Sequence, residues 1–286
     1  MTAVNLHDKT AAFEPPADQS RQVRPKPIIE LRGVGKTYRS KDRSLTVFAG
    51  FSCLIEPRSF LSIVGPSGCG KSTLLKLISG LEPPSGGEIL FNGGRVEAPP
   101  KGMIYVFQQY AKSILPWRTV VENIEFGLRA RNKVSFKDAR ERCHEYIELV
   151  GLQGYENYYP YQLSGGMQQR VCIARALICE PEVLLMDEPF SAVDAMTRAI
   201  LQELVLRIWQ QLPITILFVT HDVDEAVFLS SRIIALGRAG AGISDDVPIG
   251  LPQPRDQIAT RADPRFTELR QKLFASIFAQ EKSAAP

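Results

Sequence analysis

Residues 65–73 read Gly65-Pro66-Ser67-Gly68-Cys69-Gly70-Lys71-Ser72-Thr73 and fit the phosphate-loop pattern, in which glycine and four further residues precede Gly-Lys-Ser/Thr. The apolar run Phe60 to Val64 before them predicts a buried strand, and the leucine-rich stretch after them predicts a helix. Glycines in such a strand–loop–helix unit let backbone N–H groups approach phosphate oxygens. We therefore expect a nucleotide site rather than a ligand-free glycine turn, with Lys71 at the β- and γ-phosphates and the Ser72 hydroxyl on Mg²⁺.

The composition is that of a globular protein. The chain has 286 residues, of which 44% are hydrophobic and 23% charged, so it can bury a substantial core. Its formal net charge of +3 is too small to indicate nucleic acid or an anionic membrane surface as the main partner. The five cysteines contain no C-x-x-C pair, which predicts reduced thiols in a cytosolic protein rather than a disulfide framework or zinc site. The sequence has no apolar run long enough to span a membrane and no secretory signal at its start.

Short apolar strands alternate with helical patterns along most of the chain. Residues 1–26 are polar and contain prolines, and we expect them to form a disordered tail. The alternation beyond them predicts an α/β fold with a largely parallel sheet that is covered on both faces. The helical stretch between Phe107 and Val183 interrupts the alternation and predicts an inserted subdomain. Strands are expected at 28–31, 46–51, 60–64, 89–91, 103–107, 183–186, 214–219 and, as the last one, 232–236.

Two acidic residues, Asp187 and Glu188, follow the apolar run 183–186. Open α/β sheets present ligands at the carboxyl ends of their strands, so both side chains are expected near the phosphate loop. Asp187 would lie near Ser72 and Mg²⁺, and Glu188 would polarise a water that attacks the γ-phosphate. Such a pair could instead cap the next helix, but beside a phosphate loop the catalytic interpretation is the stronger one.

Two further polar residues follow predicted strands. Gln108 comes after Val106-Phe107, where its amide could touch Mg²⁺ or the attacking water, although the neighbouring Gln109 makes the assignment ambiguous. His221 comes after a strand that ends at Thr220, and its imidazole could donate to the γ-phosphate or orient Glu188. Each alone would be read as a polar turn residue, so both roles depend on the rest of the set.

The stretch Leu163-Ser164-Gly165-Gly166-Met167-Gln168-Gln169-Arg170 predicts a second anion-binding tip. Ser-Gly-Gly at a helix start offers a hydroxyl and bare backbone N–H groups. Because the phosphate loop already holds one side of the nucleotide, a second tip on the helical block suggests contact with a phosphate presented by another copy of the chain. An ordinary N-cap followed by flexible glycines is the alternative.

These elements, in this order and spacing, resemble the ATP-binding subunits of ABC transporters over roughly residues 28–240. The resemblance implies a P-loop NTPase fold with a mostly parallel central sheet, an antiparallel β subdomain and a helical subdomain at about 109–178. It divides the chain into the tail 1–26, an ATPase domain at 27–240 and a C-terminal extension at 241–286. It also implies two subunits that enclose two ATP molecules, with Tyr38 on adenine and Asp194 bridging the subunits.

The resemblance assigns the expected site as follows. Catalytic roles fall to Lys71, Gln108, Glu188 and His221, and the Mg²⁺ ligands are Ser72, Gln108 and Asp187. The nucleotide-binding residues are Tyr38, Gly65, Pro66, Ser67, Gly68, Cys69, Gly70, Lys71, Ser72, Thr73, Gln108, Ser164, Gly165, Gly166, Gln168, Asp194 and His221. The sequence departs from the family pattern at Val193, where Leu is usual, and at Arg58-Ser59, where a Gly-Glu turn is common. Neither departure removes a catalytic group.

A narrower resemblance points to the nitrate, sulfonate and taurine import ATPases. It rests on Leu115-Pro116-Trp117-Arg118-Thr119-Val120, on Leu251-Pro252-Gln253-Pro254-Arg255-Asp256 and on Asp263-Pro264-Arg265-Phe266. It implies membrane permease subunits as partners, a solute-binding protein as an indirect partner, and a peripheral position on the cytoplasmic face of the inner membrane. Trp117 would lie where a permease docks, although packing inside the helical block explains it equally well.

Other functions remain possible from the sequence. A non-transport ABC ATPase acting in DNA repair or on ribosomes usually has two cassettes, long coiled coils or zinc modules, and this sequence has none of them. A kinase or GTPase built on the same loop has no need for Ser164-Gly165-Gly166. A scaffold that binds ATP without hydrolysis is disfavoured by Glu188 and His221. The transported solute is not readable, because this subunit contacts only nucleotide and membrane subunits.

Overall fold

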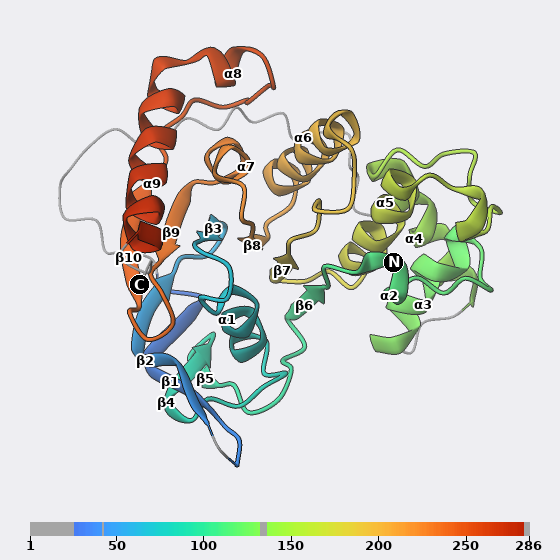
Figure 1. Ribbon diagram of the computed structural model, residues 1–286. Coiled ribbons are helices and arrows are strands. Elements are labelled where there is room, and N and C mark those ends of the chain that lie inside the picture. The colour runs from blue at the N-terminus through green and yellow to red at the C-terminus, as the bar shows by residue number, and fades with distance from the viewer. Residues whose placement is uncertain (1–25, 42, 132–135, 283–286) are drawn as a thin grey trace.

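Two β-sheets and a separate block of helices make up the protein (Figure 1), whose computed structural model describes residues 26–41, 43–131 and 136–282. The predicted disordered tail, apart from Lys26, lies outside the described residues. No helix in the described ranges is both long and apolar enough to cross a membrane.

The central sheet has six strands in the order β10-β9-β3-β8-β7-β6. Strands β9, β3, β8, β7 and β6 pair in parallel, and β10 joins the edge antiparallel to β9. Parallel pairing brings their carboxyl ends to one edge of the sheet. The bounds are β3 Phe60–Val64, β6 Met103–Val106, β7 Val183–Asp187, β8 Thr215–Val219, β9 Arg232–Leu236 and β10 Ile243–Pro248.

Helices cover both faces of this sheet, as the uninterrupted apolar strands predict. On β7, Leu184 and Met186 face one hydrophobic core while Val183 and Leu185 face the other. The first core also contains side chains of α5 (Gly165–Leu177), α6 (Ala195–Gln211) and α7 (Val223–Leu229), and the second contains those of α1 (Lys71–Ile78). Each fully buried leucine contributes about 1.5–3 kcal/mol relative to an exposed one, so both faces hold β7 in place.

The second sheet is the expected antiparallel subdomain, with four strands in the order β2-β1-β4-β5. Its strands are β1 Ile29–Arg39, β2 Ser44–Ile55, β4 Gly86–Phe91 and β5 Gly94–Arg95. Asn92 and Gly93 join the last two with positive φ angles, as the Asn-Gly pair predicts. The Arg58-Ser59 departure lies in the turn between β2 and β3, away from the phosphate loop, and Arg58 adopts a left-handed φ of 58° there.

The inserted helical block lies at one end of the molecule (green to yellow in Figure 1) and packs through α5 on the edge strand β6. Its other helices are α2 Tyr110–Ser113, α3 Val120–Arg131 and α4 Phe136–Leu149, and the short 3₁₀ turn η1 (Pro160–Gln162) leads into α5. The insertion and its place after β6 agree with the predicted subdomain.

The prediction that the last strand is 232–236 is wrong, because β10 follows it. This edge strand carries Asp245 and Asp246 and lacks the apolar run by which the buried strands were recognised. It is fixed instead by pairing with β9 and by an ion pair between Arg232 and Asp246, whose N–O distance is 2.6 Å. The chain ends in α8 (Ala259–Ala262) and α9 (Pro264–Lys282), which packs on α7, β9 and β10.

Candidate functional site

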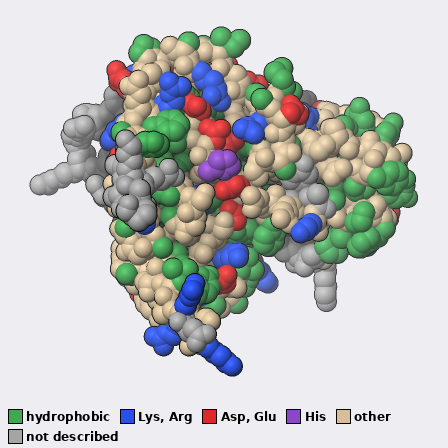
Figure 2. Space-filling model, in the orientation of Figure 1, with side chains coloured by type: hydrophobic (Ala, Val, Ile, Leu, Met, Phe, Trp, Pro, Cys, Tyr) green, Lys and Arg blue, Asp and Glu red, His purple; other side chains and the backbone are tan. Residues whose placement is uncertain are grey.

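The predicted site residues gather at the carboxyl edge of the central sheet. The loop at 65–73 follows β3, Gln108 follows β6, Glu188 follows β7 and His221 follows β8. Figure 2 shows acidic side chains and a histidine in the middle of the face that lies over the ends of these strands. Parallel pairing of β3, β8, β7 and β6 therefore brings together residues that are up to 156 positions apart in the chain (His221 and Gly65).

The phosphate loop is tightly packed from behind and open at the helix end. Gly70 has a φ of 107°, and a Cβ on it would lie 2.3 Å from Val47 Cγ1 on β2, so only glycine fits. Gly70 is also the N-cap of α1, and no side chain caps the helix there. The first N–H groups of α1 are thus available to an anion, as expected for phosphate binding.

The Lys71 side chain is hydrogen-bonded to the backbone of its own phosphate loop. Its Nζ donates to the carbonyl oxygens of Gly65 at 2.7 Å and of Pro66 at 2.9 Å, and the residue is buried. The ammonium group is therefore held at the centre of the loop, where it can reach phosphate oxygens. Cys69 is buried and its pKa is raised by burial, so its contribution to the loop is its backbone rather than a reactive thiol.

Asp187 is buried at the end of β7 between two hydroxyl groups. Ser72 Oγ donates to its Oδ1 at 2.9 Å, and Tyr105 Oη donates to its Oδ2 at 2.8 Å. Burial raises the pKa of Asp187, and the two hydrogen bonds oppose this shift by favouring the ionised form. The expected proximity of Asp187 to Ser72 is therefore present, and Tyr105 is an additional partner.

Glu188 is the centre of a second polar cluster. Its Oε2 accepts from Gln108 Nε2 at 3.2 Å and lies 3.2 Å from His221 Nδ1. Glu188 adopts a left-handed φ of 43°, an uncommon backbone conformation for a glutamate that turns the chain sharply after β7. Of the two neighbouring glutamines, it is Gln108 whose amide contacts Glu188.

Tyr38 lies at the end of β1 with its ring 40% exposed. Its hydroxyl donates to Glu82 Oε2 at 2.6 Å, a bond that lowers the pKa of Glu82, and Lys36 Nζ lies 4.9 Å from the ring centroid. The ring is thus fixed by its edge while part of its surface stays accessible, an arrangement that suits stacking on a base.

The serine–glycine stretch and Asp194 form one separate surface. Ser164 is the N-cap of α5, where its Oγ accepts from Met167 N at 3.3 Å, and Asp194 caps α6 by accepting from Thr197 N at 3.0 Å. The two helix starts touch, since a Cβ on Gly166 would lie 2.3 Å from Thr197 Cγ2. In the described part of the chain, no hydrogen bond or ion pair joins Ser164 or Asp194 to residues 65–73.

Gln168 does not point outward from this surface. Its Nε2 donates to the carbonyl oxygens of Pro160 at 2.9 Å and Leu163 at 3.3 Å, so it holds the turn that leads into α5. In this structure it supports the shape of the Ser164 tip rather than offering its amide to a ligand.

Three residues of these clusters were missed from the sequence: Tyr105, Glu82 and Thr197. Tyr105 lies inside the apolar strand β6, where its polar tip gives no pattern of its own, and its partner Asp187 is 82 positions away. Glu82 and Thr197 are surface polar residues of ordinary appearance. Their contacts follow from the packing of elements that the sequence does not place relative to one another.

Comparisons with known proteins agree with this geometry. Residues 48–191 match the family model described as "ABC transporter". The aliphatic sulfonates import ATP-binding protein SsuB of Bacillus cereus is 42% identical over 245 residues, covering 86% of this chain and 94% of that protein. The chain belongs to the ABC transporter ATP-binding proteins. It is an ATP-binding and ATP-hydrolysing protein with the P-loop NTPase fold of this family.

Two further ABC proteins add to the comparison. The nitrate import ATP-binding protein NrtC of Synechococcus elongatus is 42% identical over 261 residues, which are 90% of this chain and 38% of that protein. The solved dimeric structure of the ATP-binding cassette MJ0796, in a post-hydrolysis state bound to ADP and Pi, has a TM-score of 0.68 and 32% identity. It covers 77% of this chain and 98% of that chain.

The environment of Asp187 gives a prediction for the pH dependence of the ATPase. Tyr105→Phe removes a hydrogen bond that favours the ionised carboxylate, so the pKa of Asp187 rises further. If the ionised form is needed for activity, the acidic limb of the ATPase pH–rate profile moves to higher pH. Steady-state rates measured across acidic to neutral pH test this, with Tyr155→Phe on the helical block as the control. An acidic limb that stays in place, or moves to lower pH, contradicts the prediction.

Proposed function

We propose that Glu188 is the general base of ATP hydrolysis in this ABC protein. The observation that supports it is the cluster at the end of β7, where Glu188 lies within 3.2 Å of both Gln108 and His221, next to the phosphate loop. Glu188 would draw a proton from water, Gln108 would position that water, and His221 would hold the carboxylate in place and contact the γ-phosphate. Lys71 would balance the charge that develops on the phosphoryl oxygens.

We further propose Mg²⁺ as the metal of this site. Ser72 Oγ and Asp187 Oδ1 lie 2.9 Å apart, and Gln108 follows the neighbouring strand, so hydroxyl, carboxylate and amide oxygens are all near the loop. Such hard oxygen donors suit Mg²⁺, which is usually completed by water and phosphate oxygens. When bound, the ion would neutralise charge on the β- and γ-phosphates.

Two copies of the chain would complete each site. Ser164 and Gly165 form an exposed helix start with the chemistry of an anion site, and Gly166 is buried beside them. In the described residues, no hydrogen bond or ion pair joins Ser164 to residues 65–73 of its own chain. A second copy can present them to the γ-phosphate from the opposite side, with Asp194 beside them. The dimeric state of the MJ0796 cassette, which is similar to this chain, supports the arrangement.

The protein would power import of a small anionic solute through separate membrane subunits. Relatives that cover most of this chain are named for aliphatic sulfonate and nitrate import, which supports nitrate, sulfonate or taurine as the type of solute. The membrane subunits would hold the protein at the cytoplasmic face of the inner membrane, and a solute-binding protein would deliver the solute to them.

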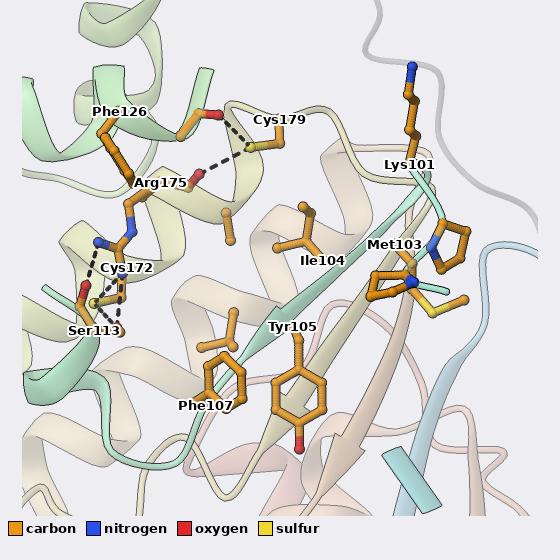
Figure 3. A pocket seen from close by; sticks show the side chains of 15 residues that line it. Lys101, Met103, Ile104, Tyr105, Phe107, Ser113, Phe126, Cys172, Arg175 and Cys179 are labelled. Atoms are coloured by element: carbon orange, nitrogen blue, oxygen red, sulfur yellow. Dashed lines mark hydrogen bonds between the residues drawn. The ribbon is translucent and has the colours of Figure 1, made fainter. Parts of the chain in front are cut away.

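The docking surface for a membrane subunit would lie between β6 and the helical block. A cavity of about 420 Å³ opens there, and Figure 3 shows Phe107, Phe126 and Arg175 among the side chains that line it. Phe107 and Phe126, which line the cavity, are 47% and 43% exposed, and Trp117, which is outside its lining, is 71% exposed. The exposure of Trp117 supports docking over packing inside the block, the alternative left open by the sequence.

Glu188→Gln tests the chemical step. The amide keeps the shape of the side chain but cannot accept a proton, so turnover should fall by roughly 10²-fold or more. ATP binding should persist, because the phosphate loop is unchanged. Hydrolysis rate and equilibrium binding of ATP, measured on the same preparation, separate the two effects. Unchanged hydrolysis would remove Glu188 from the mechanism.

Ser164→Arg tests the two-chain site. A bulky cation at the exposed helix start should prevent closure of two copies and abolish ATPase activity, while each chain still binds ATP through its own loop. Gln153→Arg adds the same charge elsewhere on the helical block and serves as the control. The two-chain arrangement is wrong if the specific activity of the unaltered protein is independent of protein concentration and Ser164→Arg retains that activity.

Trp117→Ala tests the docking surface. Loss of a large exposed aromatic anchor should weaken association with the membrane subunits by roughly tenfold or more, and should leave the ATPase activity of the isolated protein unchanged. Co-purification of the chain with its membrane subunits measures the first effect. Leu45→Ala, an exposed apolar residue on β2, is the control. Equal recovery of both variants with the membrane subunits would place docking elsewhere.

A further inference from the structure

The C-terminal extension is hydrogen-bonded to the helix that follows His221. Helix α7 begins two residues after His221, and Figure 1 shows it between α6 and α9. Arg255, from the Leu251–Asp256 segment, is buried and its Nη1 donates to the carbonyl oxygens of Phe228 at 2.8 Å and Ser230 at 2.9 Å, at the carboxyl end of α7. A guanidinium in this place satisfies carbonyl groups that the helix itself cannot.

The amino end of α7 is held by a buried chain of polar groups. Thr220 Oγ1 donates to Glu225 Oε2 at 2.6 Å, and Gln202 Nε2, from α6, donates to Glu225 Oε1 at 3.0 Å. All three residues are at most 4% exposed. Buried polar groups that satisfy one another in this way fix a single arrangement, because a missing partner would leave an unpaired group in the core.

This chain of hydrogen bonds continues from α6 into the C-terminal extension. Gln257 Nε2 donates to Gln202 Oε1 at 3.0 Å, and Arg261 Nε donates to Gln257 Oε1 at 2.9 Å. The guanidinium of Arg261 also lies over the rings of Phe228 and Phe266, 5.3 and 5.7 Å from their centroids, so α8 is packed against α7 and α9. A continuous line of hydrogen bonds thus runs from the extension to Thr220.

The Thr220 hydroxyl is hydrogen-bonded to the backbone of the loop that contains His221. Its Oγ1, besides donating to Glu225, accepts from Asp222 N at 3.0 Å, so one hydroxyl bridges the residues on either side of His221. Rotation of Thr220 would break this bridge and release the His221 backbone. The Glu225–Thr220 hydrogen bond thus lies at the base of the loop whose imidazole is 3.2 Å from Glu188.

We propose that the extension, through Gln257, Gln202 and Glu225, is a positioning element for His221, which assigns a catalytic contribution to a segment outside the nucleotide site. This rests on the role of His221 in the proposed function. Loss of Gln257 would remove the hydrogen bond to Gln202 at one end of this series, and a change at Glu225 would weaken the hydrogen bond to Thr220 at the other end. Both changes should slow the chemical step without altering the phosphate loop that binds ATP.

Gln257→Ala and Gln253→Ala form a matched pair for the test. Both glutamines are in the extension and both bond to a glutamine of α6, but Gln253 Oε1 accepts from Gln210 Nε2 at 2.8 Å, outside the chain to Thr220. We expect Gln257→Ala to lower kcat by about fivefold with KM for ATP within about twofold, as for a group that acts only on the chemical step. Gln253→Ala should match the unaltered protein.

A double-mutant comparison identifies the route of the effect. In a His221→Ala background, measured in single turnover at excess protein so that slow hydrolysis stays visible, Gln257→Ala should cause no further loss. Glu225→Gln, which is isosteric but places a donor where acceptors are needed, should lower kcat like Gln257→Ala. Thermal unfolding of each variant separates this from loss of fold.

Different results would contradict the inference about the extension and the proposed role of His221. If Gln257→Ala keeps the full kcat, or lowers it equally with and without His221, the extension does not act through His221 and the inference fails. If His221→Ala itself hydrolyses ATP at the normal rate, the proposed role of His221 fails instead.

Discussion

The burial of one carboxylate, Asp187, imposes the constraint on which the site depends. Removal from water disfavours its charge and raises its pKa, so the fold must supply donors at this point. Ser72 on α1 and Tyr105 on β6 do so, which ties the helix of the phosphate loop and the edge strand to the end of β7. The next residue, Glu188, is held at the end of β7 by its own N–H, which donates to the carbonyl oxygen of Val219 at 2.9 Å. The proposed catalytic geometry is thus arranged around a buried carboxylate that would be unfavourable without its hydrogen-bond partners.

The same architecture fits the proposal that one chain holds only part of the nucleotide site. Gln108, Glu188 and His221 follow parallel strands at the same sheet edge as the phosphate loop. Ser164 and Asp194 instead start helices of a second surface whose parts contact each other through Gly166 and Thr197. Gly166 is required there by the close approach of Thr197, so packing alone demands glycine at this position, whatever its proposed role in anion binding. A surface of two capped helix starts that pack on each other, without a hydrogen bond to the loop of its own chain in the described residues, suits the proposed recognition of a nucleotide held by another copy.

Much of this could be predicted because strands and motifs are local in sequence. The convergence of Gln108, Glu188 and His221 follows from their places directly after buried strands, and the parallel sheet then brings them together. Tyr105, Glu82 and β10 were missed for physical reasons: the first two act through contacts with distant residues, and β10 is a polar edge strand without an apolar run. The contacts of the Gln168 NH₂ group with the turn before α5 were also not predicted, because the carbonyl groups that it satisfies are set by that turn.

The direction of the chain of hydrogen bonds between the extension and His221 is set by its two ends. Arg261 can only donate, so Gln257 must turn its oxygen toward Arg261 and its NH₂ group toward Gln202. Gln202 is then forced to present its own NH₂ group to Glu225, whose two oxygens accept from Gln202 and Thr220. Neither amide can flip without setting donor against donor. The contact between Arg261 and Gln257 therefore fixes the orientation of the Thr220 hydroxyl beside His221. His221 and Arg261 lie in segments that share no motif and are about forty residues apart along the polypeptide (221 to 261).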